Sequence, residues 1–215
     1  MTGVRVLVGT RKGAFICSSD GTRQDWDVTG PLFGGWEIYH VKGSPADANR
    51  LYASQTSGWS GQVIQRSDDG GKTWEPVGNK FSYDGTPGTH QWYDGTPHPW
   101  EFARVWHLEP SLHDPDTVYV MPLEPMTRAC PGGAPAVWRS ENGGESWRRL
   151  SKGLPKKETY FTVLRDGMDI DDLKSPALYF GTTTGQLWIG RDGGEKWECL
   201  FDALPPIHNV KVAVV

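Results

Sequence analysis

The eight residues Ser67-Asp68-Asp69-Gly70-Gly71-Lys72-Thr73-Trp74 occur again, slightly altered, further along the chain. Residues 140–147 read Ser-Glu-Asn-Gly-Gly-Glu-Ser-Trp, and residues 190–197 read Gly-Arg-Asp-Gly-Gly-Glu-Lys-Trp, without the serine. Residues 18–26 form a looser copy that is one residue longer. A turn motif that recurs at long intervals indicates a repeat architecture, so the chain is a series of similar units.

The chemistry of the motif is that of a tight turn. Ser and Asp side chains accept hydrogen bonds from nearby backbone N–H groups, and paired glycines adopt positive φ at little cost. The closing Trp is large and mostly apolar, so it can pin the turn against a neighbouring unit. We therefore predict a structural role, not a catalytic one, for Ser67, Asp69, Gly71, Thr73, Trp74, Ser140, Gly144, Trp147, Asp192, Gly194 and Trp197.

The spacing of the motif predicts the size of each unit. The closing tryptophans are Trp26, Trp74, Trp147 and Trp197, which gives intervals of 48, 73 and 50 residues. A propeller blade of four strands takes about 40–50 residues, which matches the two shorter intervals. The long interval carries about 24 extra residues, and we assign them to an insertion over residues 81–104.

Each unit contains short β-branched and aromatic runs bounded by Gly, Pro, Asn and Asp, which favours an all-β fold. No stretch has sustained helical periodicity. The sequence predicts strands over 37–41, 50–53 and 62–66 in unit two, 105–108, 118–120 and 136–139 in unit three, and 161–164, 178–180 and 186–189 in unit four.

The two ends of the chain are predicted to meet. The first unit begins with a strand over residues 4–8 and lacks a first strand, whereas residues 209–215 form a strand-like run with no motif after it. We expect this run to complete the N-terminal blade and close a four-bladed β-propeller, the low end of the known range. Residues 1–215 then form one domain, with blades over 1–30 plus 207–215, 31–78, 79–151 and 152–204.

The repeated turn is the Asp-box, and the chain resembles the BNR/Asp-box repeat β-propeller family. That family includes sialidases, related glycoside hydrolases and many bacterial WD40/YVTN/BNR-like repeat proteins. The resemblance implies that the box is a scaffold element away from the active face. It also implies a shortened chain, joined near residues 118–121, because relatives with similar ends have more blades. The alternative is an eight-bladed homodimer formed by strand exchange.

Composition narrows the functional classes. The net charge is −4 and the pI is about 5.9, so the chain lacks the excess of positive charge that is typical of nucleic-acid-binding proteins. Three cysteines without motif spacing do not predict a disulfide framework. Residues 1–15 lack the apolar core of a signal peptide, and no apolar run reaches membrane-spanning length. We expect a reduced, cytoplasmic protein that does not contact a membrane.

The candidate site lies where the loops before each first strand and between second and third strands converge, the face that carries the insertion. Aromatic rings beside polar groups suit sugars, and Arg binds carboxylates through two parallel hydrogen bonds. We predict that Arg11, Arg104 and Arg165 bind an anionic group of a glycan or other small ligand. Polar groups and aromatic walls of this ligand site are predicted to be His40, His107, Trp36, Trp100 and Trp106.

Catalytic candidates follow from the resemblance to sialidases, which use a Tyr nucleophile activated by Glu, an Asp acid and three arginines. The candidates are Glu101, Tyr160 and Asp166, with Tyr93, Glu37 and Asp94 as alternatives. The Arg-Ile-Pro signature of sialidases is absent from the sequence.

The histidines match no standard metal motif, because the spacings His90–His98 and His98–His107 are not those of known sites. We therefore expect hydrogen-bonding histidines, with no metal or cofactor. Three functions remain: a glycosidase-like or carbohydrate-binding propeller, exo-sialidase-like if active; a non-catalytic interaction scaffold; and a shortened relic of a longer propeller. The fold does not choose among them.

Overall fold

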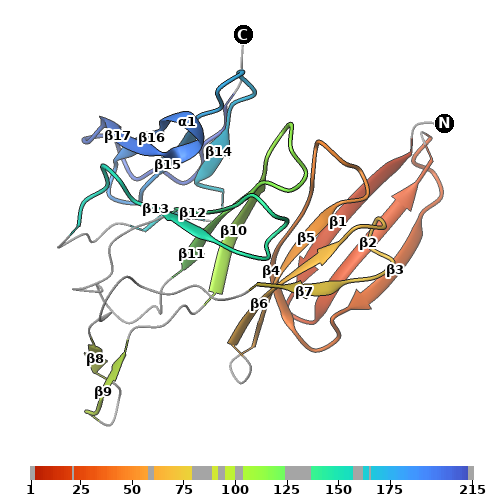
Figure 1. Ribbon diagram of the computed structural model, residues 1–215. Helices are drawn as coiled ribbons and strands as arrows, with labels where there is room; N and C mark the ends of the chain where they lie inside the picture. Colours follow the sequence, from red (N-terminus) through yellow and green to blue (C-terminus); the bar gives the residue numbers. More distant parts are fainter. Residues whose placement is uncertain are drawn as a thin grey trace.

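The repeated turn joins the last two strands of each β-sheet in the computed structural model, which describes residues 3–20, 22–57, 61–78, 89–91, 95–99, 104–123, 137–156, 162–164 and 166–212. Among the described residues, four antiparallel sheets of three or four strands follow one another along the chain and lie in a row (Figure 1). The all-β prediction is therefore confirmed. The segment labelled α1 (Arg191–Gly194) is the fourth box turn, with Asp192 (φ 52°) and Gly193 (φ 65°) in the left-handed region.

The strands of each sheet are arranged in chain order from the inner edge outward. The first sheet is β1 (Val4–Thr10), β2 (Gly13–Ser19) and β3 (Asp27–Leu32); the second is β4 (Glu37–Gly43), β5 (Leu51–Ser57), β6 (Gly61–Ser67) and β7 (Glu75–Val77). The third is β10 (Arg104–Pro110), β11 (Val118–Leu123), β12 (Val137–Ser140) and β13 (Arg148–Leu150); the fourth is β14 (Met168–Ile170), β15 (Leu178–Gly181), β16 (Leu187–Gly190) and β17 (Lys196–Phe201).

One predicted strand is wrong. Residues 162–164 form no strand, and the fourth sheet begins instead with β14. Met168 and Ile170 are buried and pair with Phe180 and Leu178. These two alternate residues of β14 therefore point into the core. Thr162 is exposed, and its carbonyl accepts a hydrogen bond from the Thr183 N–H outside the sheet.

The box turn satisfies its own polar groups. Ser67 is 1% exposed; its Oγ accepts a hydrogen bond from the Gly71 N–H at 2.8 Å and donates to Asp69 Oδ1 at 2.8 Å. The Asp69 carboxylate also accepts hydrogen bonds from the Thr73 hydroxyl and N–H, which lower the pKa of Asp69. In the third sheet the Gly144 N–H donates to Ser140 Oγ at the same distance of 2.8 Å.

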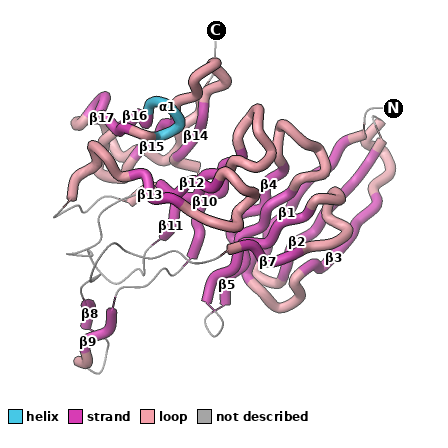
Figure 2. The backbone as a smooth tube through the Cα atoms, viewed as in Figure 1, coloured by secondary structure: helices cyan, strands magenta, loops and turns pink. Residues whose placement is uncertain are grey.

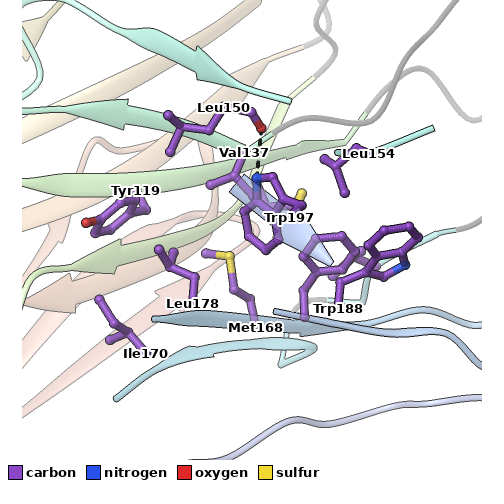
Figure 3. Close-up of a cluster of buried hydrophobic side chains, with 12 residues drawn as sticks. Tyr119, Val137, Leu150, Leu154, Met168, Ile170, Leu178, Trp188 and Trp197 are labelled. Carbon is purple, nitrogen blue, oxygen red and sulfur yellow. Dashed lines mark hydrogen bonds between the residues drawn. The ribbon is translucent and has the colours of Figure 1, made fainter. Parts of the chain in front are cut away.

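Loss of the serine in the fourth box has a steric reason. A Cβ at Gly190 would lie 2.8 Å from three ring carbons of Trp197. Trp197 is 2% exposed and its indole N–H donates to the Leu150 carbonyl at 3.1 Å, the dashed line in Figure 3. Glycine at position 190 therefore makes room for the closing Trp at the centre of a buried cluster.

Each of the last three boxes packs against the sheet before it. A Cβ at the second glycine would collide with a side chain of that preceding sheet: Gly71 with Ile16, Gly144 with Val77, and Gly194 with Leu150. Both sheets of each pair are thus in close contact at the turn, and bulk at these positions would separate them. The closing tryptophans act in the same place: Trp74 packs edge-on against Phe33, Trp147 Nε1 donates to the Gly78 carbonyl, and Trp197 contacts Leu150.

Replacing Ser67 with Ala is expected to reduce the free energy of unfolding by about 1–3 kcal/mol, because the buried Gly71 N–H loses its acceptor. Chemical denaturation of the wild type and the variant measures this. Ser140→Ala should cost a similar amount. The matched control is Ser19→Ala in the looser first copy, where the exposed Oγ donates to the Asp25 carbonyl, and a cost as large as that of Ser67→Ala would contradict the account.

Closure of the ring by the C-terminal strand is not confirmed. Residues 206–212 form no strand; instead the Val210 N–H donates to the Asp166 carbonyl and the Val212 N–H to Asp169 Oδ2, so this segment bonds to the fourth sheet. β1 remains the inner edge of the first sheet. Figure 1 shows the first and fourth sheets at opposite ends of the row.

The first sheet lacks the strand that the other sheets have at their inner edge. In the second, third and fourth sheets the box follows the third strand, but in the first sheet it follows β2, the second strand. Neighbour contacts agree with this assignment, because β1 and β2 both contact β4, as β5 and β6 both contact β10. β1 is thus equivalent to the second strand of a complete sheet.

Part of the predicted insertion forms a small hairpin. β8 (Thr89–Gln91) pairs with β9 (Pro97–Pro99), with His90 opposite His98. Figure 2 shows this hairpin apart from the four sheets. The rest of residues 81–104, except Gly95, Thr96 and Arg104, lies outside the described residues.

Candidate functional site

The inner strands β4 and β10 lie side by side and run in the same direction (Figure 1). Cross-contacts advance along both strands together: Tyr39 contacts Trp106, His40 contacts His107, and Lys42 contacts Glu109. Both strands therefore begin at one end of the row. We call this end the loop face. It includes the turn 10–13 and the loop 33–36, and the two are linked by a hydrogen bond of 3.2 Å from the Gly35 N–H to the Lys12 carbonyl.

Three polar groups meet at the loop face. The Tyr39 hydroxyl donates a hydrogen bond to Glu37 Oε2 at 2.8 Å, and Arg11 Nε lies 3.5 Å from Glu37 Oε1. The Arg11 side chain is 89% exposed, so it contributes little to stability and is accessible to a ligand. Glu37 and Tyr39 belong to the same strand, and Tyr39 occupies a β-bulge between Ile38 and His40, where the regular alternation of faces is interrupted. The group thus combines a cation, a carboxylate and a phenol at one accessible place.

Aromatic rings adjoin this group. Trp106 of β10 packs on Tyr39 with ring centroids 5.4 Å apart and planes tilted by 31°. Trp36 is half-buried and packs against the cluster of Ala14, Ile38 and Ala53, so it supports the first two sheets. Of the three predicted wall tryptophans, Trp106 therefore contacts the polar group through Tyr39, and Trp100 lies outside the described residues.

A second polar group is buried further along the same two strands. Glu109 is 2% exposed, and Lys42 Nζ lies 2.6 Å from both of its carboxylate oxygens. His107, also 2% exposed, lies with Nε2 2.9 Å from Glu109 Oε2. His40 packs beside His107 with centroids 4.9 Å apart, and its Nδ1 accepts the Leu108 N–H at 2.8 Å. We call Lys42, His107 and Glu109 the buried triad.

The buried triad favours a charged carboxylate at Glu109. Burial alone would raise the pKa of this group, but the hydrogen bond to His107 and the charge of Lys42 outweigh burial and lower the pKa. The negative charge is thus kept inside the protein by its two partners. Because Glu109 and His107 are both shielded from solvent, the triad is suited to fixing β10 against β4 and not to reacting with a ligand.

The predicted site residues are only partly brought together. His40 and His107 are neighbours, and Arg11 and Trp106 adjoin the Glu37–Tyr39 pair. Asp166 is exposed at the start of the fourth sheet, and its carbonyl accepts the Val210 N–H. Arg104 begins β10, level with Leu123 of β11. Glu101, Tyr160, Arg165, Trp100, Tyr93 and Asp94 lie outside the described residues.

The sequence analysis missed Tyr39, Lys42 and Glu109. Glu37 was named only as an alternative partner for a more distant Tyr. The available signal was that Glu37 and Tyr39 stand close together on one predicted strand, which can bring a phenol and a carboxylate within reach of each other. The described residues contain no group of three or more His, Cys, Asp and Glu side chains that could hold a metal ion.

No helix in the described part of the chain is long and apolar enough to cross a membrane. No protein-family model and no curated protein matches the sequence.

Solved structures resemble the fold. An ancestral GH74 enzyme aligns over 91% of this chain and 23% of its own, at 16% identity and a TM-score of 0.50. YCF48 from Cyanidioschyzon merolae aligns over 79% of this chain and 38% of its own (20% identity, TM-score 0.47). The NanB sialidase of Streptococcus pneumoniae aligns over 83% of this chain and 26% of its own (16% identity, TM-score 0.42).

The ancestral GH74 enzyme is a β-propeller, and the likeness to it supports the propeller class for the four sheets. At such low identity it shows the fold alone. The chain spans between 23 and 38% of the length of these three proteins. Membership of the Asp-box family stays a prediction from the repeated turn.

Proposed function

We propose that this chain is a sialidase-like Asp-box propeller that binds a carbohydrate or another small anionic ligand at the loop face, with glycosidase-type chemistry. The observation that carries the proposal is the Tyr39–Glu37 hydrogen bond of 2.8 Å beside the exposed Arg11. A phenol paired with a carboxylate is an activated nucleophile, and glycosidases with a Tyr nucleophile exist. Arg11 supplies the positive charge that an anionic sugar requires.

The roles follow from the chemistry of these groups. The Tyr39 oxygen attacks the anomeric carbon while Glu37 takes the phenolic proton, and the glycosidic bond breaks. The leaving alcohol takes a proton from a general acid, and water later releases the sugar from Tyr39. Trp106 forms an apolar wall beside the pair. Asp166 remains our candidate for the acid; Glu101, Tyr160, Arg104, Arg165, Trp36, Trp100 and His40 remain proposed parts of the site. His107 is buried beside Glu109 and has a supporting role in β10.

The test is turnover of a panel of fluorogenic glycosides, a sialoside included. Tyr39→Phe and Glu37→Gln should each lower kcat by at least about 100-fold, the range for loss of a proton-transfer partner. The matched control is Tyr179→Phe, because the Tyr179 hydroxyl donates to Asp171 Oδ2 at 2.9 Å in the fourth sheet. Full activity in Tyr39→Phe would move the reaction to other residues, with Glu101→Gln as the next variant.

Absence of turnover on every substrate by folded wild type would favour the second candidate function, a non-catalytic interaction scaffold. One observation supports it independently: both ends of the row of sheets expose large apolar side chains. A relic shortened from a longer propeller, a strand-exchanged homodimer and a cytoplasmic location also remain proposals from the sequence.

A further inference from the structure

Exposed apolar side chains gather at the two ends of the row of sheets. Among the described residues, the large hydrophobic side chains that are exposed all belong to the first sheet, to the fourth sheet or to their turns, and none to the second or third. They are Val6, Val8, Trp26 and Val28 at one end, and Leu173, Leu200, Phe201 and Leu204 at the other. Scattered apolar residues are ordinary on a surface, but sets confined to both ends of a row indicate contacts.

The exposed face of the first sheet is the one that points away from the second sheet. Val6 lies opposite Cys17, and Cys17 lies opposite Val28, so these three residues share a face. The other face carries Ile16, which the Gly71 turn of the second sheet contacts. Val28 is 62% exposed, so this face of the first sheet is open to solvent.

The turn of the first box is exposed to solvent, as Val28 is. The closing tryptophans of the second, third and fourth boxes each contact the preceding sheet. Trp26 donates to the Arg23 carbonyl of its own turn, as Trp74 does to the Gly71 carbonyl. Trp26 is 40% exposed, however, whereas Trp74 and Trp147 are half-buried and Trp197 is buried. No described sheet of this chain lies against Trp26. By analogy with the other three boxes, we expect a further sheet to pack against Trp26.

The fourth sheet offers the complementary surface. Leu187 and Trp188 are successive residues of β16 and point to opposite faces, and Trp188 belongs to the cluster that packs on the third sheet. Leu187 pairs with Phe201, so Phe201 faces away from the third sheet, and it is 56% exposed. Phe201 corresponds to Leu150 of the third sheet, which contacts the following box turn. Ile207 of the same chain covers another part of this face, because it lies against Gly181, the partner of Leu187.

We propose that the fourth sheet of one copy of this chain packs on the first sheet of a second copy, head to tail, so that two copies form an eight-sheet ring. Trp26 and Val28 of one copy contact the Phe201 face of the other, and the same contact recurs at the second junction. Eight sheets lie within the range of propeller rings, about 4–8 blades. The contact is between sheet faces, it does not require exchange of residues 207–215, and it does not depend on glycosidase activity.

Sedimentation velocity of the whole chain over a concentration series tests the proposal. The wild type should sediment as a species of twice the chain mass of 23.9 kDa. The first-end variant Val6→Lys/Val28→Lys and the last-end variant Phe201→Lys should each raise the dissociation constant at least about tenfold, because a charge would be buried in an apolar contact. Asn49→Lys, an exposed position of the second sheet, is the control and should leave the mass unchanged.

Mixing the two end variants distinguishes head-to-tail packing from other contacts. An equimolar mixture has one intact junction per pair, so dimers should reappear. A wild type that stays monomeric at every concentration overturns the proposal, as does a dimer that survives both end variants. Open filaments would show that the contact does not close. Dimers lost only on deletion of residues 209–215 would assign the contact to strand exchange instead.

Discussion

Replacing Trp197 with Ala is expected to lower the free energy of unfolding by about 3–5 kcal/mol, the range for loss of a large aromatic side chain from a core. Trp197 is 2% exposed and packs beside Met168, Phe180 and Leu150 at the junction of the third and fourth sheets (Figure 3). The variant also removes the donor to the Leu150 carbonyl. Urea denaturation followed by circular dichroism measures the loss.

The control is Trp26→Ala, the same residue type at the same position of the first box. Trp26 is 40% exposed and its indole bonds only within its own turn among the described contacts. Its replacement should change the unfolding free energy of the monomer by about 0.5 kcal/mol or less. Equal losses in the two variants would show that burial against the preceding sheet is not what stabilises the box.

The repeated turn made most of the fold predictable from sequence. Its hydrogen bonds are local, within residues 67–74 and 140–147, so the motif fixes the hairpin without knowledge of distant residues. Its spacing then gives the number and order of the sheets. The fourth sheet's first strand was harder, because β14 is three residues long and the apolar run at 161–164 resembles a strand equally well. Pairing with β15, a tertiary choice, selects Met168–Ile170.

Closure depends on contacts that no local pattern encodes. Residues 209–215 have strand propensity, but in the described part of this segment the Val210 and Val212 N–H groups donate hydrogen bonds to the Asp166 carbonyl and the Asp169 carboxylate. Strand propensity shows that a segment suits a sheet and does not specify which edge it joins. The open edge of β1 and the exposed Val28 therefore appear only in the structure.

In the candidate site, too, residue types could be predicted from the sequence, but their burial could not. His40 and His107 were predicted to share a site, and they are neighbours because β4 and β10 are equivalent inner strands of adjacent sheets. The sequence analysis treated them as ligand-binding groups. The structure places His107 inside the buried triad, where Lys42 and Glu109 are its environment. Polar residue types predict that a site is polar, but burial determines whether a ligand can reach it.

Two polar groups thus lie one after the other along the strands β4 and β10. At the loop face, Glu37 and Tyr39 lie beside an exposed Arg11, where groups can meet a ligand. Deeper along the strands, the triad holds the two sheets in register by charge. A buried ion pair adds little net stability over an apolar pair, but removal of one partner is costly. The triad therefore fixes the relative position of the strands that carry the loop-face group.

Replacing Glu109 with Gln should accordingly reduce the free energy of unfolding by about 3–5 kcal/mol, because the Lys42 ammonium and His107 lose their buried anion. The double variant Lys42→Met/Glu109→Gln removes both charges and should recover part of this loss. Denaturation of the wild type, both single variants and the double variant gives the coupling energy. Strict additivity of the two single changes would contradict the interaction.

The same pair has a signature in pH. The pKa of Glu109 in the folded protein lies below its ordinary value of 4.5, so its contribution to stability is present above pH 4.5 and is lost as the pH falls through the folded pKa. The difference in unfolding free energy between wild type and Glu109→Gln should therefore be largest near neutral pH and shrink below pH 4.5. Denaturation of both proteins between pH 3 and 7 measures this. A difference that stays constant down to pH 3 would mean that Glu109 stabilises the strands by shape alone, without its charge.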